Sequence, residues 1–123
     1  MSKVVSVARA GQGEVNGLYF QKSPDIIPTG FVRTCNEMNW PSESMWKRLS
    51  DPSRPWFLSQ ENDSYIYYNR GDGNWWIDLP SGAGAYIVES SDEDPPSGGW
   101  VALPGNKPPL PTVEVRESAN KEL

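Results

Sequence analysis

The chain has 123 residues, enough for one domain with its own hydrophobic core, and a net charge of −5. It contains no histidine, which excludes Ser-His and Cys-His catalytic pairs and removes the commonest general base and metal ligand. No cluster of basic residues occurs, so we expect neither a nucleic-acid partner nor an anionic membrane partner.

Cysteine content and apolar patterning indicate a reducing, soluble compartment. Cys35 is the only cysteine, so no internal disulfide can form. No apolar run reaches the roughly 20 residues that a membrane span needs, and the start of the chain is too short and too broken for a signal peptide. We therefore expect a cytoplasmic location.

Twelve prolines and eleven glycines favour many turns over long helices, and six tryptophans with five tyrosines predict an aromatic core. Short β-branched or alternating runs predict strands at residues 4–7, 18–20, 31–35 and 56–58. Residues 41–50 form the one expected helix, and Ser42 is its expected N-cap. The apolar side of that helix consists of Met45, Trp46 and Leu49.

Residues 64–80 predict a β-hairpin that organises the rest of the chain. Two runs rich in β-branched and aromatic residues flank Asp72-Gly73, a dipeptide that suits a two-residue type I′ turn. Such a turn would place Asn69 opposite Trp76. Because side chains alternate between the two faces of a strand, one face should be core. The expected core face carries Ile66, Tyr68, Trp75, Ile77 and Leu79. The opposite face, called here the aromatic–polar face, carries Tyr65, Tyr67, Asn69, Trp76 and Asp78.

The C-terminal part of the chain continues the sheet and then becomes proline-rich. Residues 85–88 predict a strand beside the hairpin, and residues 99–103 predict a short strand. Residues 112–116 alternate and fit either an edge strand or an extended tail. We expect one β-rich domain at 1–104 and a Pro-rich extended segment at 105–123, frayed from Glu117 onward.

The predicted fold class is all-β, an antiparallel meander-like sheet of about six or seven strands with one short helix. We expect this sheet to be twisted or partly closed. Trp75 and Tyr68 should belong to its core, whereas Trp76 and Tyr67 should be partly exposed.

Two resemblances add to this interpretation. The pattern Val15-Asn-Gly-Leu-Tyr19, Tyr65-Ile-Tyr67, Trp75-Trp-Ile77, Tyr86, Pro95-Pro96 and Gly99-Trp100 resembles a small tryptophan-rich β-module that occurs, often repeated, in large uncharacterised proteins of algae and oomycetes. This resemblance covers most of residues 4–113, with 36–63 as an insertion, and it implies no established activity.

The second resemblance is to WW domains, which bind proline-rich peptides on a three-stranded sheet. It is carried by Trp56, Tyr67-Tyr68, Asn69, Trp76 and Pro80. The loop His and Thr of the WW pattern are absent, and the spacing from Trp76 to Pro80 is one residue longer. The likeness implies a peptide ligand for this stretch.

The aromatic–polar face is the main candidate ligand-binding site, because flat rings beside hydrogen-bonding groups suit sugars and proline-rich peptides. The alternative is that the helix or another strand covers this face and makes it core. A second candidate site, for a protein partner with an aromatic groove, is the segment Pro108, Pro109, Leu110 and Pro111. This segment could instead be a rigid strap that packs on the domain.

Three further features indicate no chemistry by themselves. The acidic residues Glu89, Asp92, Glu93 and Asp94 lack the spacing of a calcium loop, so we expect a solvated loop and no metal site. Cys35 has no histidine or cation pattern around it and should be a small buried hydrophobe. Carboxylates in turns are ordinary turn formers, so we expect no catalysis and no cofactor.

We therefore expect a non-enzymatic binding or interaction module that uses the aromatic–polar face and the Pro-rich segment. Its expected partner is a protein or peptide, and possibly a glycan. One alternative is a carbohydrate-binding module, and another is a structural subunit of a larger assembly.

Overall fold

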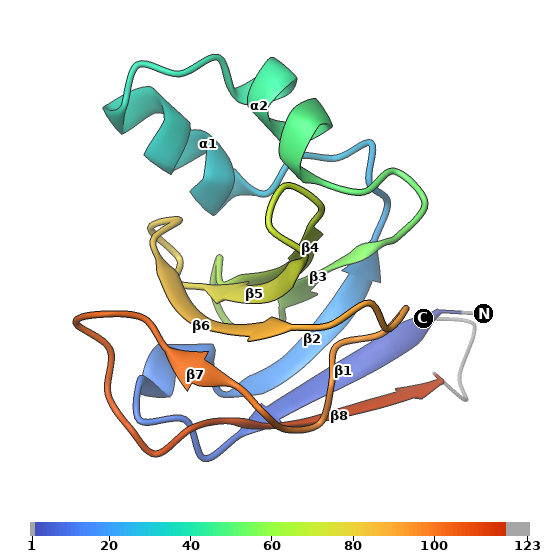
Figure 1. Cartoon of the computed structure of the whole chain (residues 1–123), viewed down its shortest axis with the longest axis vertical. Helices are drawn as coiled ribbons and strands as arrows, with labels where there is room; N and C mark the ends of the chain where they lie inside the picture. The colour runs from blue at the N-terminus through green and yellow to red at the C-terminus, as the bar shows by residue number, and fades with distance from the viewer. Residues whose placement is uncertain (1, 118–123) are drawn as a thin grey trace.

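The computed structural model describes residues 2–117, which form one curled antiparallel sheet of eight strands, two short α-helices and one turn of 3₁₀ helix (Figure 1). The strands are β1 (Lys3–Ala8), β2 (Gly17–Lys22), β3 (Trp56–Ser59), β4 (Tyr65–Asn69), β5 (Asn74–Asp78), β6 (Gly84–Glu89), β7 (Val101–Ala102) and β8 (Thr112–Glu117). The 3₁₀ turn is η1 (Gly13–Val15). The all-β prediction is confirmed, with eight strands where six or seven were expected.

Strands β1 to β7 form a meander, because each pairs antiparallel with the next along the chain. The last strand, β8, departs from this order and returns to pair with β1 along its whole length, so the spatial order is β7-β6-β5-β4-β3-β2-β1-β8. The curl brings the interior faces of these strands together (Figure 1).

The sheet extends past residue 104, where we expected the β-rich domain to end. Alternation in β8 places Val113 and Val115 against the interior core, and Val113 is 1% exposed. Glu117, which we expected to be frayed, pairs with Lys3 of β1. The sheet therefore includes residues 112–117, and the expectation for 118–123 lies outside the described residues.

The interior of the curled sheet holds the main hydrophobic core. Trp75 and Trp100 are its largest side chains, and both are essentially buried. Burying this much ring surface supplies much of the favourable free energy of folding. The remaining buried members of this interior core are Val5, Val7, Ala10, Val15, Tyr19, Phe57, Ile66, Ile77, Ala85, Tyr86, Val88 and Val113.

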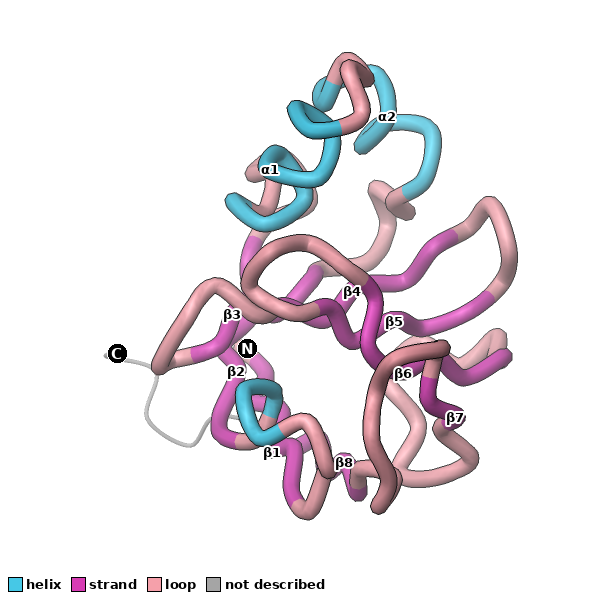
Figure 2. Tube along the Cα trace, turned by 90° about the vertical axis from the view of Figure 1, so that its left-hand side faces the viewer, coloured by secondary structure: helices cyan, strands magenta, loops and turns pink. Residues whose placement is uncertain are grey.

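Two helices, α1 (Thr29–Glu37) and α2 (Ser42–Leu49), connect β2 to β3 and lie on the other side of the sheet (Figures 1 and 2). Residues 31–35, which we predicted as a strand, belong to α1. The alternation of Phe31, Arg33 and Cys35 fits a strand, but Phe31 and Cys35 are also four residues apart and so share one helix face. Both side chains are buried against rings of the sheet, and Pro28 directly precedes the helix. Neither helix is long and apolar enough to cross a membrane, as judged over the described part of the chain.

The prediction of α2 is confirmed, apart from its first turn. Pro41 occupies the N-cap position without a side-chain cap, and Ser42 is the first helical residue. Trp46 is buried, and its indole N–H donates to the Pro24 carbonyl at 2.9 Å. Met45 and Leu49 pack beside it, as the spacing predicted.

The β4–β5 hairpin is present, but its register differs from the predicted one by two residues. Tyr67 pairs with Trp76 and Asn69 pairs with Asn74, which leaves a four-residue loop at 70–73. Gly73 has a φ of 74°, but the φ of Asp72 is not positive. Among the described residues, the non-glycine residues with positive φ are Arg9 and Asn39. A type I′ turn needs positive φ at both central residues, so the predicted turn type is wrong. An even register shift leaves every side chain on its predicted face.

Candidate ligand-binding site

The aromatic–polar face of the hairpin lies beneath α1 and α2. Tyr65 and Asp78 are buried, Asn69 is 7% exposed and Trp76 is half-buried. Tyr67 is only 4% exposed, so the expectation that it forms part of an open platform is wrong. The alternative, that a helix covers this face, is the one the structure adopts, because packing on the helices removes these rings from water.

Ring packing holds the two helices against the sheet. The Phe31 ring meets Trp46 edge-on at a centroid distance of 5.0 Å and Tyr67 at 6.2 Å. Trp46 lies 5.4 Å from Tyr67, and Tyr67 lies 6.5 Å from its cross-strand partner Trp76. Such edge and tilted arrangements suit the quadrupoles of aromatic rings, so this second cluster fixes the position of each ring.

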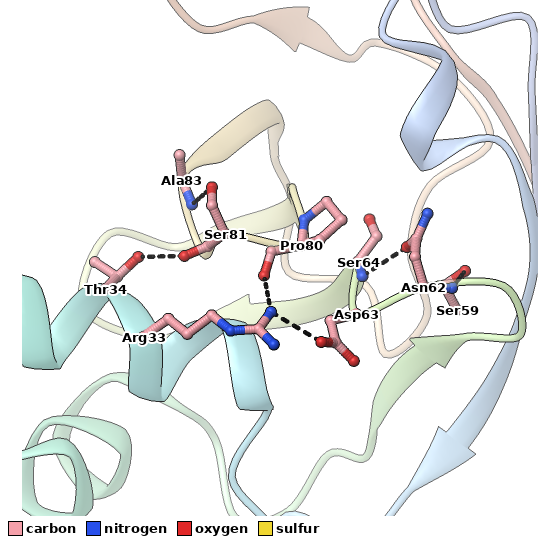
Figure 3. Close-up of polar contacts among 9 residues, drawn as sticks. All are labelled: Arg33, Thr34, Ser59, Asn62, Asp63, Ser64, Pro80, Ser81 and Ala83. Atoms are coloured by element: carbon pink, nitrogen blue, oxygen red, sulfur yellow. Dashed lines mark hydrogen bonds and ion pairs between the residues drawn. The ribbon is translucent and has the colours of Figure 1, made fainter.

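Polar contacts fix the same helices to the loops around the face. On α1, the Arg33 guanidinium pairs with Asp63 at 2.8 Å and donates to the Pro80 carbonyl at 3.0 Å (Figure 3). The Thr34 hydroxyl donates to the Ser81 carbonyl at 3.1 Å, as Figure 3 also shows. These contacts tie α1 to the turn between β5 and β6 and, through Asp63, to the loop between β3 and β4.

The β4–β5 loop holds the end of α2 in a similar way. The Arg70 guanidinium donates to the carbonyls of Lys47 and Arg48, and the Arg70 backbone N–H donates to the Leu49 carbonyl at 2.8 Å. The last carbonyls of a helix have no partner within the helix, and a cation there also complements the helix dipole. Both helices are therefore anchored at the edges of the aromatic–polar face.

A small cavity remains between the helices and this face. Its volume is about 200 Å³, and four of the five predicted ligand-binding residues line it: Tyr67, Asn69, Trp76 and Asp78. Tyr65, the fifth, lies in the surrounding ring cluster. The structure thus brings the predicted set together around a pocket, in place of an open surface.

The other walls of the cavity come from residues that sequence patterns did not assign to a site. Phe31, Thr34 and Cys35 contribute from α1, and Met45 and Leu49 contribute from α2. Trp40, in the loop between the helices, is 44% exposed and also lines the cavity. The four-residue spacing of Phe31 and Cys35 after a proline could have revealed α1, but nothing local shows what it packs against.

Asp78 is the unusual group in this cavity. Its side chain is 3% exposed, and its Oδ1 atom has no hydrogen-bond partner. Burial raises the pKa of the Asp78 carboxyl to about 7, and the hydroxyl of Tyr65, its cross-strand partner, opposes that rise. Buried polar atoms are nearly always paired, and a perturbed carboxyl in a pocket is a typical feature of a functional site.

Asn69 and Trp76 already use their polar atoms, whereas the Tyr65 hydroxyl, like Asp78 Oδ1, is buried without a hydrogen-bond partner. The Asn69 amide donates to the Tyr67 hydroxyl at 3.2 Å and accepts from the Gly71 N–H at 2.8 Å. The Trp76 indole N–H donates to the Asp72 carboxylate at 3.0 Å. These bonds orient the rings, so Asp78 and its cross-strand partner Tyr65 are the members of the set whose polar atoms are left unpaired, and Asp78 is the one of the two that lines the cavity.

The second predicted site, the Pro-rich segment, lies elsewhere. The Gly11 N–H donates to the Pro109 carbonyl at 2.9 Å, and the hydroxyl of Tyr86, an interior-core residue, donates to the Lys107 carbonyl at 2.7 Å. Pro108, Pro109 and Leu110 remain exposed, whereas Pro111 is buried. The backbone is thus held like a strap, while three of the four side chains face solvent.

The remaining sequence features behave as simple structural elements. Asp94 of the acidic loop forms an ion pair with Lys3 at 2.8 Å. Across the described residues, no group of three or more Cys, Asp or Glu side chains is arranged to hold a metal ion. Cys35 is buried as predicted, and burial raises the pKa of its thiol.

Comparison with protein-family models, with curated proteins and with solved structures finds no match to this chain. The resemblances to the tryptophan-rich β-module and to WW domains therefore stay predictions.

Proposed function

We propose that this protein is a non-enzymatic binding module whose ligand inserts a compact group into the cavity between the helix pair and the aromatic–polar face. The single observation that supports this most directly is the buried Asp78 carboxyl, which has an unpaired oxygen in a largely apolar pocket. Pockets with apolar walls and a few convergent polar groups are the usual form of small-ligand sites.

The size of the cavity restricts what can enter. A dry cavity of roughly 150 Å³ can hold a benzene molecule, so about 200 Å³ accommodates one ring or a branched head group of similar bulk. A glycan chain or an extended peptide would need the open platform that α1 and α2 cover. The covered face therefore favours a small group over the peptide or glycan that the sequence led us to expect.

A cavity-filling substitution tests this proposal. Cys35→Met should extend a side chain into the cavity and abolish binding of single-ring fragments detected by ligand-observed NMR. Cys35→Ala is the matched control, because it leaves the cavity open and should retain binding. If no fragment binds the wild-type protein, or if fragments bind Cys35→Met as well as they bind the wild-type protein, the cavity is not a binding site.

The Pro-rich segment supports a second candidate function, docking to a protein partner. Its exposed residues Pro108, Pro109 and Leu110 are presented on a backbone that is held in place, which lowers the entropy lost on binding. Titration with isolated proline-binding SH3 and WW domains tests this candidate, with Leu110→Ser as the weakened variant. If none of the SH3 and WW domains binds the protein, this second candidate function is rejected.

A further inference from the structure

We propose that the group bound in this cavity is a methylated ammonium ion, with the Asp78 carboxylate as its counter-charge and Trp40, Tyr67 and Trp76 as its aromatic wall. This inference rests on the proposed function, because it specifies the chemistry of the ligand for the same cavity. It follows from the charge, the ring content and the hydrogen-bond state of the lining residues.

The charge of the lining favours a cation. Asp78 is the one carboxylate among the described residues that line the cavity, and no Lys or Arg is among them. Its Oδ1 atom makes no hydrogen bond, and the Tyr65 hydroxyl, which is also unpaired, offsets the effect of burial on the Asp78 pKa only in part. A buried carboxylate is strongly destabilised without a partner, which is why the unliganded Asp78 carboxyl keeps its proton up to about pH 7. A ligand cation would stabilise the ionised form, whereas an anion would oppose it.

The rings favour the same class of ligand. Two tryptophans, one tyrosine and one phenylalanine line a cavity of about 200 Å³. Cations are attracted to the electron-rich faces of aromatic rings, most strongly to Trp, and clusters of such rings recognise quaternary ammonium groups. The hydrogen bond from the Trp76 indole to Asp72 and the bond from Asn69 to the Tyr67 hydroxyl hold two of these rings in place before any ligand arrives.

The state of the polar groups distinguishes a methylated ammonium from a primary one. A primary ammonium has three N–H donors, each of which needs an acceptor when buried. The lining offers few acceptors: the Asp78 carboxylate and the oxygen of the Thr34 hydroxyl, whose own proton is donated to the Ser81 carbonyl, while the Asn69 amide oxygen already accepts from Gly71. A trimethylammonium group has no N–H and so leaves no donor unpaired on entering the cavity. Its methyl groups also match the apolar wall.

The geometry also allows entry. Trp40 is 44% exposed, and Met45, Leu49 and Trp76 are partly exposed where they border the cavity. Asp78 lines the buried end of the same cavity. We therefore expect a charged head group to lie toward Asp78 while the rest of a longer ligand stays outside.

The test compares choline with two relatives by isothermal titration calorimetry on the full chain. One relative is the neutral isostere, in which a tert-butyl group replaces the trimethylammonium group, and the other is ethanolamine. Choline should bind at least about tenfold more tightly than either, which is the scale of a partly desolvated cation–π interaction. Equal affinity for choline and the neutral isostere would overturn the inference. This comparison needs only the wild-type protein.

Two substitutions test whether Asp78 supplies the counter-charge. Asp78→Asn keeps the shape of the side chain but removes the charge, so it should abolish the preference for choline over the neutral isostere. Asp92→Asn, the same change at an exposed position outside the cavity, should leave that preference intact. If Asp78→Asn retains the preference, the assignment of the counter-charge is wrong.

The two proposals can fail separately. If neutral fragments bind in a manner that Cys35→Met blocks, but choline does not bind, the ammonium assignment fails and the cavity remains a binding site. If neither choline nor any neutral fragment binds, both proposals fail.

Discussion

The buried carboxyl of Asp78 should make the stability of the protein fall as pH rises. Burial raises the pKa of this group from 3.8 to about 7, so the folded state binds a proton that the unfolded state has already released in this interval. Unfolding free energy then decreases with pH, because stability rises with pH only where the unfolded state binds more protons. The decrease in unfolding free energy begins near pH 4 and is complete above about pH 7.

The magnitude follows from the same two values. Each tenfold change in proton affinity corresponds to 1.36 kcal/mol, so the interval from 3.8 to about 7 gives roughly 4 kcal/mol. The neighbouring titratable groups do not interfere, since burial raises the pKa of Tyr19, Tyr65, Tyr67 and the Cys35 thiol and keeps all four neutral between pH 4 and pH 8. Asp78→Asn cannot ionise and should lack this dependence.

Urea denaturation followed by tryptophan fluorescence at several pH values between 4 and 8 measures the effect. Near pH 4 the wild-type protein and Asp78→Asn should be about equally stable, and near pH 8 the variant should be more stable by up to about 4 kcal/mol. Subtracting the two curves cancels the titration of every other carboxylate. A difference that does not change with pH, or a variant that is less stable at pH 8, would show that Asp78 has a partner or is hydrated in the folded protein.

Three further predictions concern the sheet, and each is checked by chemical denaturation. Trp75→Ala should lower the free energy of unfolding by about 3–5 kcal/mol, because Trp75 is 0% exposed in the interior core. Trp76→Ala should lower it clearly less, because Trp76 is half-buried. The reverse order would contradict the assignment of the two faces. Gly73→Val should cost about 1 kcal/mol or more, because a β-branched residue resists a φ of 74°, even though nothing lies within 4 Å of the added Cβ. The same change at Gly98, which has equal space, should cost less, and equal losses would show that backbone strain is not the cause. Val113→Asp should cost several kcal/mol by burying an unpaired charge, and a neutral result would mean that β8 does not dock on β1 in solution.

Much of the sheet was predictable from local patterns. Residues 4–7, 18–20, 56–58 and 85–88 were recognised as strands because β-branched and aromatic residues alternate between turn signals. The hairpin faces were also right, although the turn was not. A wrong turn length shifted the pairing by two residues, and an even shift cannot move a side chain to the other face.

The errors occurred where a local pattern was compatible with two structures. Phe31, Arg33 and Cys35 fit a strand by alternation and a helix by the four-residue spacing of the two apolar members. Contact of Phe31 with Trp46 and Tyr67 selects the helix, and those partners are distant in sequence. In the same way, the alternation in residues 112–116 was compatible with either a free tail or an edge strand. Pairing with the edge of β1 makes it a strand.

The sequence alone determined the class of fold, the two faces of the hairpin and the five residues of the aromatic–polar face. It could do so because the two-residue period of a strand is a property of the backbone, independent of what packs on it. Tertiary structure alone decided that α1 and α2 cover that face and that a cavity remains beneath them. It also decided that Asp78 lies there without a partner. Burial, pairing and pKa depend on atoms contributed by other elements, and no local pattern around residue 78 contains those atoms.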